Sequence, residues 1–208
     1  ATGIEFKQAI KYSERSSSQI TGILHIIVTV PDFTPRFFMR KVDLENANLF
    51  LEDHKSEFII PIPEESNFES YDEFLQQFRA LMALSHWIDE ASEERILKQF
   101  GIEPGDLHRA VENADWLLYS LAEVCKIIGR TNFLIEIDLL RRRIKYGVKS
   151  ELLSLTTLEG IGRVRARSLF NAGLRNLVKL RAASYNQIAS VEKIGPAVAR
   201  KIKSQISG

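Results

Sequence analysis

The chain has 208 residues, 45% of them apolar and 26% charged, which is enough sequence for one large domain or two smaller ones. No apolar run approaches the roughly 18 residues that a membrane-spanning helix needs, and the opening ATGIEFKQAI lacks the basic-then-apolar layout of a secretory signal. These features argue against a membrane protein and predict a cytoplasmic location, where the lone Cys125 needs no disulfide partner.

The net charge of +1 hides two segments of opposite sign. Residues 1–140 carry 13 basic and 24 acidic side chains, a charge of −11, whereas residues 141–208 carry 15 basic and 3 acidic side chains, a charge of +12. A segment this basic points to nucleic acid or another anionic surface. The alternative is a basic face that is merely solvated.

The elements expected before residue 70 are short. The segment of residues 4–19, IEFKQAIKYSERSSSQ, predicts one short helix that runs into a serine cluster, without a partner helix of its own. The apolar run of residues 21–35 contains two prolines near its end and is too short to assign to helix or strand. Asp43 is expected to cap a helix over residues 44–55.

Four longer helices are predicted between residues 70 and 147. Ser70 and Glu73 form an S-x-x-E capping box that begins a helix running to about Ala91. The next three are expected from Ser92 to Gly101, from Leu107 to Ile128 with Gly129 closing it, and from about Asn132 to Tyr146 with Gly147 closing it. No strand alternation interrupts them, so the sequence predicts an all-α helical bundle.

One of these helices carries a tryptophan outside its main apolar face. At about 100° per residue, one face comprises Phe74, Phe78, Leu81, Ser85 and Ile88, and the opposite face comprises Gln76, Ala80, Ala83 and Trp87. The small and polar neighbours leave room beside Trp87 for a strand of nucleic acid. The alternative is a helix that buries both faces.

After Gly147 the sequence contains two copies of one pattern, TTLEGIGRVRARSLFNAGL and ASVEKIGPAVARKIKSQI. Gly160 and Gly162 align with Lys193 and Gly195, 33 residues later. Glycines allow φ > 0 and a close approach to a ligand, and the N–H groups at the start of the following helix attract an anion. Phosphate is the expected anion because basic residues crowd these helices: Arg163, Arg165, Arg167, Arg200 and Lys201.

The repeated pattern resembles the tandem helix-hairpin-helix motif of DNA repair and recombination proteins, and the alternative is a plain αα-hairpin. Catalytic and metal-binding constellations are missing. No G-x-x-x-x-G-K-[ST] phosphate loop occurs, and His25, His54, His86 and His108 lack metal-ligand spacing. A helix-hairpin-helix glycosylase would place a catalytic Asp after its hairpin, but no Asp follows Asp138. We therefore expect no covalent chemistry, metal or cofactor in this chain, and we expect Cys125 to be a core residue.

The two halves together resemble one family. LMALSHWIDEASEERILKQFGIEPGDLHRAVENADWLLYSLAEV, followed by LLRRRIKYGVKSELLSLTTLEGIGRVRARSLFNAGL, is similar to the C-terminal region of the Hjm family, which are archaeal superfamily II, Ski-family ATP-dependent DNA helicases. The resemblance implies that residues 1–20 connect from a winged-helix region, that residues 21–147 form a helical ratchet domain and that residues 150–208 form a helix-hairpin-helix DNA-binding domain. The motor domains that use ATP and Mg²⁺ would lie outside this chain.

The family also implies roles for individual residues. A long ratchet helix lies along the translocating single strand, with an aromatic and an arginine that stack on bases; here these would be Trp87 and Arg79. Independently of the family, the helical wheel places Gln76 on the face of Trp87 as a further candidate. Arg163, Arg165 and Arg167 would grip the strand and restrain unwinding. The implied function is binding of single-stranded and branched DNA for a 3′-to-5′ helicase in replication-coupled repair and recombination, at the nucleoid.

A different class of function stays open. The alternative is a protein-interaction adaptor whose basic tail docks an acidic partner, such as a sliding clamp or a Holliday-junction nuclease. Salt-sensitive binding to arbitrary oligonucleotides would favour the helicase fragment, and binding only to a protein would favour the adaptor.

Overall fold

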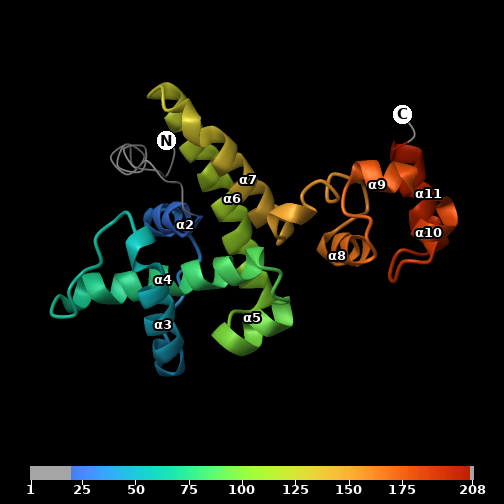
Figure 1. The fold of residues 1–208 in the computed structure, drawn as a ribbon. Coiled ribbons are helices and arrows are strands. Elements are labelled where there is room, and N and C mark those ends of the chain that lie inside the picture. The colour runs from blue at the N-terminus through green and yellow to red at the C-terminus, as the bar shows by residue number, and fades with distance from the viewer. Residues whose placement is uncertain (1–19, 207–208) are drawn as a thin grey trace. The chain divides into compact units, whose positions relative to one another are not determined.

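The computed structural model describes residues 20–206, and this part of the chain folds into helices and short 3₁₀ turns without a β-strand (Figure 1). The prediction of an all-α protein is therefore confirmed. The chain divides into two compact units, one ending at Lys145 and the other beginning at Tyr146. The helix predicted within residues 4–19 lies outside the described residues, as does the connecting segment 1–20 apart from its last residue.

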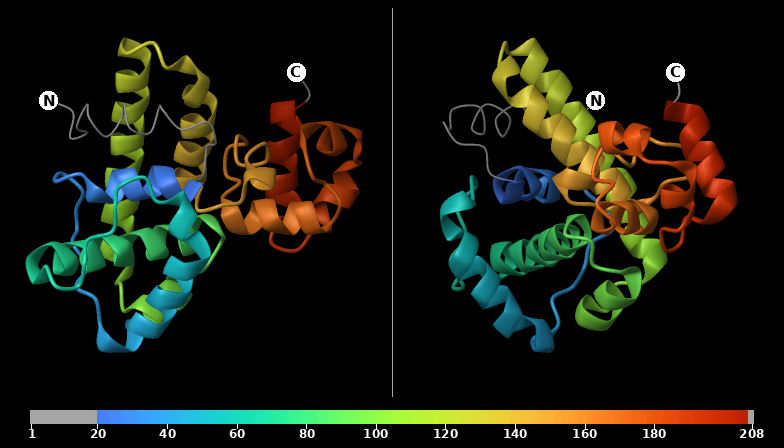
Figure 2. Two further views of the ribbon diagram at one scale, coloured as in Figure 1. Left: turned by 60° about the vertical axis from the view of Figure 1, so that its left-hand side comes forward. Right: turned by 45° about the vertical axis from the view of Figure 1, so that its right-hand side comes forward.

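Helix α4 is central to the described part of the first unit. The helices of this part are α2 (Ile20–Thr29), α3 (Leu44–His54), α4 (Phe68–Ile88), α5 (Glu93–Phe100), α6 (Pro104–Ile127) and α7 (Leu134–Tyr146). α4 packs against α2, α3, α5 and α6, while α6 and α7 lie side by side in Figure 1 and in both views of Figure 2. Cys125 is fully buried in this core, which confirms the prediction.

The apolar run that begins at residue 21 forms helix α2. All eight residues from Thr21 to Val28 are buried. A helix that is apolar on every side is stable only inside a core, and α2 packs against α4 and α6. Hydrophobic periodicity cannot distinguish such a helix from a buried strand, so the tertiary contacts decide its conformation.

Both faces of α4 are buried, which corrects the expectation of an open face beside Trp87. Phe78 and Leu81 lie in the core on one side, and on the other side Ala80 and Ala83 are each only 1% exposed. Alanines let neighbouring helices approach closely. The small residues of α4 are therefore packing positions, and no DNA strand can lie along them.

The start of α4 differs from the prediction. The helix begins at Phe68, and the side chain of Asn67 accepts a hydrogen bond from the backbone N–H of Ser70. Ser70 therefore lies inside the first turn, and Glu73 pairs with Arg36 instead of closing a capping box. Asn67, three residues earlier, caps the free N–H groups instead, so the helix gains nearly one extra turn.

The later helix ends follow the sequence closely. The side chain of Ser92 accepts from the N–H of Arg95 and caps α5. Gly101, Gly129 and Gly147 each have a positive φ just beyond a helix, as glycines at this position commonly do. These predicted ends are confirmed.

The second unit contains the two predicted hairpins. Its described α-helices are α8 (Arg163–Asn171), α9 (Leu177–Ala182), α10 (Tyr185–Ala189) and α11 (Gly195–Ile206). Its core draws equivalent residues from the two copies: Leu155, Leu158, Ile161, Ala166 and Leu169 from the first, and Ile188, Val191, Ile194, Ala199 and Ile202 from the second. Each residue of the second set follows its counterpart by 33 positions, so the sequence repeat is a repeat of the packed structure.

Candidate nucleic-acid interface

Arg79 lies inside the first unit rather than on its surface. It is 5% exposed, and its guanidinium donates to the backbone oxygens of Phe38 and Phe100. Its Nε also lies 3.5 Å from a carboxylate oxygen of Asp43. Burial lowers the pKa of Arg79, and the nearby Asp43 carboxylate opposes that shift. A guanidinium enclosed in this way cannot stack on a base, so the prediction that Arg79 contacts DNA is not compatible with the structure.

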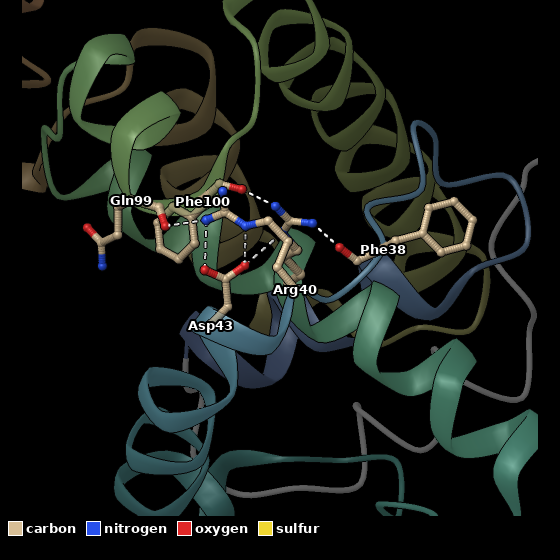
Figure 3. A network of polar contacts seen from close by, with 6 residues as sticks. Phe38, Arg40, Asp43, Gln99 and Phe100 are labelled. Carbon is tan, nitrogen blue, oxygen red and sulfur yellow. Dashed lines mark hydrogen bonds and ion pairs between the residues drawn. The ribbon is translucent and has the colours of Figure 1, made fainter.

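A second arginine, which is partly exposed, completes this network (Figure 3). Arg40 donates from Nε and Nη2 to the two carboxylate oxygens of Asp43, at 2.7 and 2.8 Å, and Nη2 also donates to the backbone oxygen of Gln99 at 2.7 Å. This explains why Asp43, although placed at the start of α3, makes no capping bond there. Gln99 and Phe100 end α5, where carbonyls lack intrahelical partners. The two arginines therefore hold the end of α5 against α4 and the segment before α3.

Trp87 is half-buried near the end of α4, with a fixed orientation. Its indole Nε1 donates to the backbone oxygen of Ile144 at 2.7 Å, and the ring packs against the core. Ile144 lies in the last turn of α7, where the carbonyl needs a partner from outside the helix. The hydrogen bond thus orients the indole.

The indole lines an open cavity of about 380 Å³. Pro104, Leu107 and Val111 give it apolar walls, and its ionisable lining residues are Glu93, His108, Glu112, Asp115 and Lys145. Apolar walls beside an indole suit a nucleobase, whereas the carboxylates oppose a phosphate. Carboxylates also accept hydrogen bonds from the amino groups of bases. The cavity is therefore a candidate site for a base rather than for the DNA backbone.

Gln76 does not belong to this cavity. Its amide donates to Asp72 at 2.9 Å on the same helix. Eleven residues separate it from Trp87, which is about 16 Å along a helix axis. The structure therefore separates two residues that the predicted face of α4 grouped together.

The turns of the two hairpins have the geometry expected of an anion-binding site. Gly160 and Lys193, which align in the sequence, both have positive φ, at 78° and 66°. Gly162 precedes α8 and Gly195 begins α11, so both lie where free N–H groups gather. A Cβ added at Gly160, Gly162 or Gly195 would meet no atom within 4 Å. The space outside each turn is open to a ligand.

Side-chain hydrogen bonds connect the two hairpins, which the sequence pattern did not predict. Arg165 donates from Nη1 to the oxygen of Gly160 at 2.8 Å and from Nε to the oxygen of Lys193 at 3.2 Å, so it joins one turn to the other. From the second hairpin, the side chain of Gln205 on α11 accepts a hydrogen bond from the backbone N–H of Glu159, next to the first turn, at 2.7 Å. Arg165 therefore holds the two turns in register.

The other basic residues differ in their surroundings. Arg167 pairs with Glu151 at 3.0 Å, and its guanidinium carbon lies 5.1 Å from the ring centre of Phe170. Arg163 is partly exposed at the start of α8, and Arg200 and Lys201 are exposed on α11. The exposed cations are thus best placed to reach phosphates.

Within residues 20–206, no group of three His, Cys, Asp or Glu side chains is placed to hold a metal ion. No helix in the same part of the chain is long and apolar enough to cross a membrane.

Two family models match the chain. Residues 21–147 match the model described as archaeal helicase, domain 4, and residues 152–207 match the model described as SAM-like helix-hairpin-helix tandem.

Curated relatives match nearly the whole chain. Over 198 residues, or 95% of this chain, it is 33% identical to the ATP-dependent DNA helicase Hel308 of Pyrococcus abyssi and 36% identical to that of Pyrococcus horikoshii. It is 35% identical over 188 residues to that of Methanocella arvoryzae. The matched regions make up 27%, 27% and 25% of these relatives, so the chain spans about a quarter of their length.

Proposed function

Since this chain belongs to the family of archaeal helicases defined by domain 4, we propose that it is the DNA-engaging C-terminal part of a 3′-to-5′ ATP-dependent DNA helicase. The motor domains, which bind ATP and Mg²⁺, lie outside these 208 residues, and the chain by itself hydrolyses no ATP. The whole helicase acts on forked or branched DNA in repair and recombination.

The observation that carries this proposal is the orientation of Trp87. Its Nε1 is fixed on Ile144, and its ring lines a cavity with apolar walls. A base that enters the cavity stacks on the indole without regard to sequence, which suits a protein that moves along a strand. We assign Trp87 the role of contacting the single strand and exclude Arg79 from it.

The second unit binds the sugar-phosphate backbone. The open turns at Gly160–Gly162 and Lys193–Gly195 present N–H groups to two phosphates, and Arg165 keeps the turns in register. Arg163 and the exposed Arg200 and Lys201 of α11 add electrostatic attraction for the phosphates of the DNA backbone. A strand held by this unit resists movement, so the same contacts restrain unwinding.

Titration of labelled single-stranded and forked DNA tests the proposal. With Trp116 replaced by Phe, Trp87 is the only indole, and we expect single-stranded DNA to quench its fluorescence. The dissociation constant should be about 10⁻⁴ to 10⁻⁶ M at physiological salt and should rise steeply with salt. An unquenched Trp87 with salt-independent binding would contradict the proposal.

A further inference from the structure

Beyond the Trp87 cavity, a second group of aromatic side chains lies exposed on α6. Tyr119 is 47% exposed and Trp116 is 45% exposed, although large aromatic side chains are usually buried. They are three residues apart, so both lie on neighbouring parts of one helix surface. Neither is used by the function proposed above.

An arginine of α7 lies over one face of the Tyr119 ring. The guanidinium carbon of Arg141 lies 5.1 Å from the centre of the Tyr119 ring. Arg141 also donates to both carboxylate oxygens of Asp115, at 2.7 and 3.3 Å. The ring and the planar cation are therefore ordered, and both stay partly open to solvent.

This pair is continuous with the Trp87 cavity, because Asp115 belongs to both. Asp115 lines the cavity and binds Arg141. Tyr119 lies four residues beyond Asp115 on α6, about 6 Å along the axis. That distance is less than two stacked nucleotides of about 3.4 Å each. A strand with one base in the cavity has its next bases within reach of Tyr119.

We propose that Tyr119, Trp116 and Arg141 form a second stacking platform, which receives the bases that follow the one in the Trp87 cavity. The inference rests on the proposed function, since it extends the path of the same single strand.

The charges favour a single strand over a duplex at this platform. The carboxylates Glu112, Asp115 and Glu123 belong to α6, whereas Arg141 and Lys145 belong to α7. A single strand can place its bases over α6 and a phosphate near the exposed Lys145 of α7, while Arg141 stays paired with Asp115. A duplex presents phosphates on both edges and would bring one row against the carboxylates.

Each of the two tryptophans reports on one region, so two single-tryptophan variants of the chain test the inference. Trp116→Phe leaves Trp87 as the reporter of the cavity, and Trp87→Phe leaves Trp116 as the reporter of the platform. Titration with a dT oligonucleotide of about 12 nucleotides should quench both. Quenching of Trp87 without quenching of Trp116 would overturn the platform and leave the proposed function standing. If neither indole is quenched, both proposals fail.

Removing the tyrosine ring tests the platform directly. In the Trp87→Phe background, Tyr119→Ala should raise the DNA concentration needed to quench Trp116 by between about five-fold and about 150-fold, which corresponds to ~1–3 kcal/mol per stacked base. Tyr119→Phe keeps the ring and should stay within about twofold of the parent. Phe68→Ala, which removes an 84% exposed aromatic at the start of α4, is the matched control and should change nothing.

The platform is wrong if Tyr119→Ala and Tyr119→Phe bind alike. It is also wrong if a lysine-rich peptide quenches Trp116 while the oligonucleotide does not, because the carboxylates of α6 would then be the recognition element.

Discussion

Replacing Trp87 by Ala separates its structural role from its role in binding. Truncating a fully buried Trp costs roughly 3–5 kcal/mol of unfolding free energy. Because Trp87 is only half-buried, we expect its truncation to cost about 2 kcal/mol. Loss of the hydrogen bond from Nε1 to the oxygen of Ile144 adds about 1 kcal/mol. We therefore expect a loss of about 3 kcal/mol, or a fall in Tm of roughly 12 °C at about 4 °C per kcal/mol for a unit of this size.

Thermal melting followed by circular dichroism measures the loss of stability, and DNA titration well below the new Tm measures binding by folded molecules. Trp87→Ala should weaken binding of single-stranded DNA by at least about fivefold, since one stacked base is worth ~1–3 kcal/mol. Trp87→Phe is the matched control, because it keeps an aromatic ring in the cavity and loses the hydrogen bond and the smaller part of the indole's packing. It should lower the free energy of unfolding by about 1–2 kcal/mol and bind DNA almost normally. Equal DNA affinity for Trp87→Ala and the parent chain would refute the reasoning.

The remaining predictions concern the buried charges, the hairpin turns and catalysis. Asp43→Ala should destabilise the first unit by roughly 3–5 kcal/mol in urea unfolding, because it leaves two arginines without their shared carboxylate; a loss below 1 kcal/mol would show that the network is dispensable. Burial lowers the pKa of His25 from 6.5 to about 4, so the folded state binds this proton more weakly than the unfolded state. Stability should therefore fall by about 3 kcal/mol as the pH drops from about 6.5 to about 4, and His25→Phe should flatten that slope. Gly162→Val should reduce DNA binding at least tenfold with its helicity unchanged, because its Cβ occupies only open space; equal losses of helicity and binding would indicate a purely structural glycine. ATP hydrolysis should be undetectable with and without DNA, and a DNA-stimulated turnover that co-purifies with the chain would reveal a missed site.

Local sequence signals determined much of the helical framework. Ser92 and Gly101 bracket α5 because a cap needs only the backbone of its own turn. The 33-residue repeat predicted the two hairpins, since the same apolar positions fill the core in both copies. The positive φ at Lys193 follows from its alignment with Gly160.

Whether an individual polar residue is buried or exposed depended on partners that are distant in the sequence. Arg79 looks like a surface arginine on a helical wheel, but backbone oxygens 41 and 21 residues away and the carboxylate of Asp43 enclose it. The wheel also cannot reveal that helices cover Ala80 and Ala83, because a small side chain fits both an open groove and a close helix contact.

The sequence by itself determined the helical class, the separation of charge and the hairpin turns, because these depend on spacing along the chain and on local backbone chemistry. Only the tertiary structure decided that Arg165 joins two turns 33 residues apart, and that Trp87 faces a cavity whose walls come from α6. Such contacts are set by the packing of separate helices, and the pattern within one helix carries no information about which neighbour it will meet.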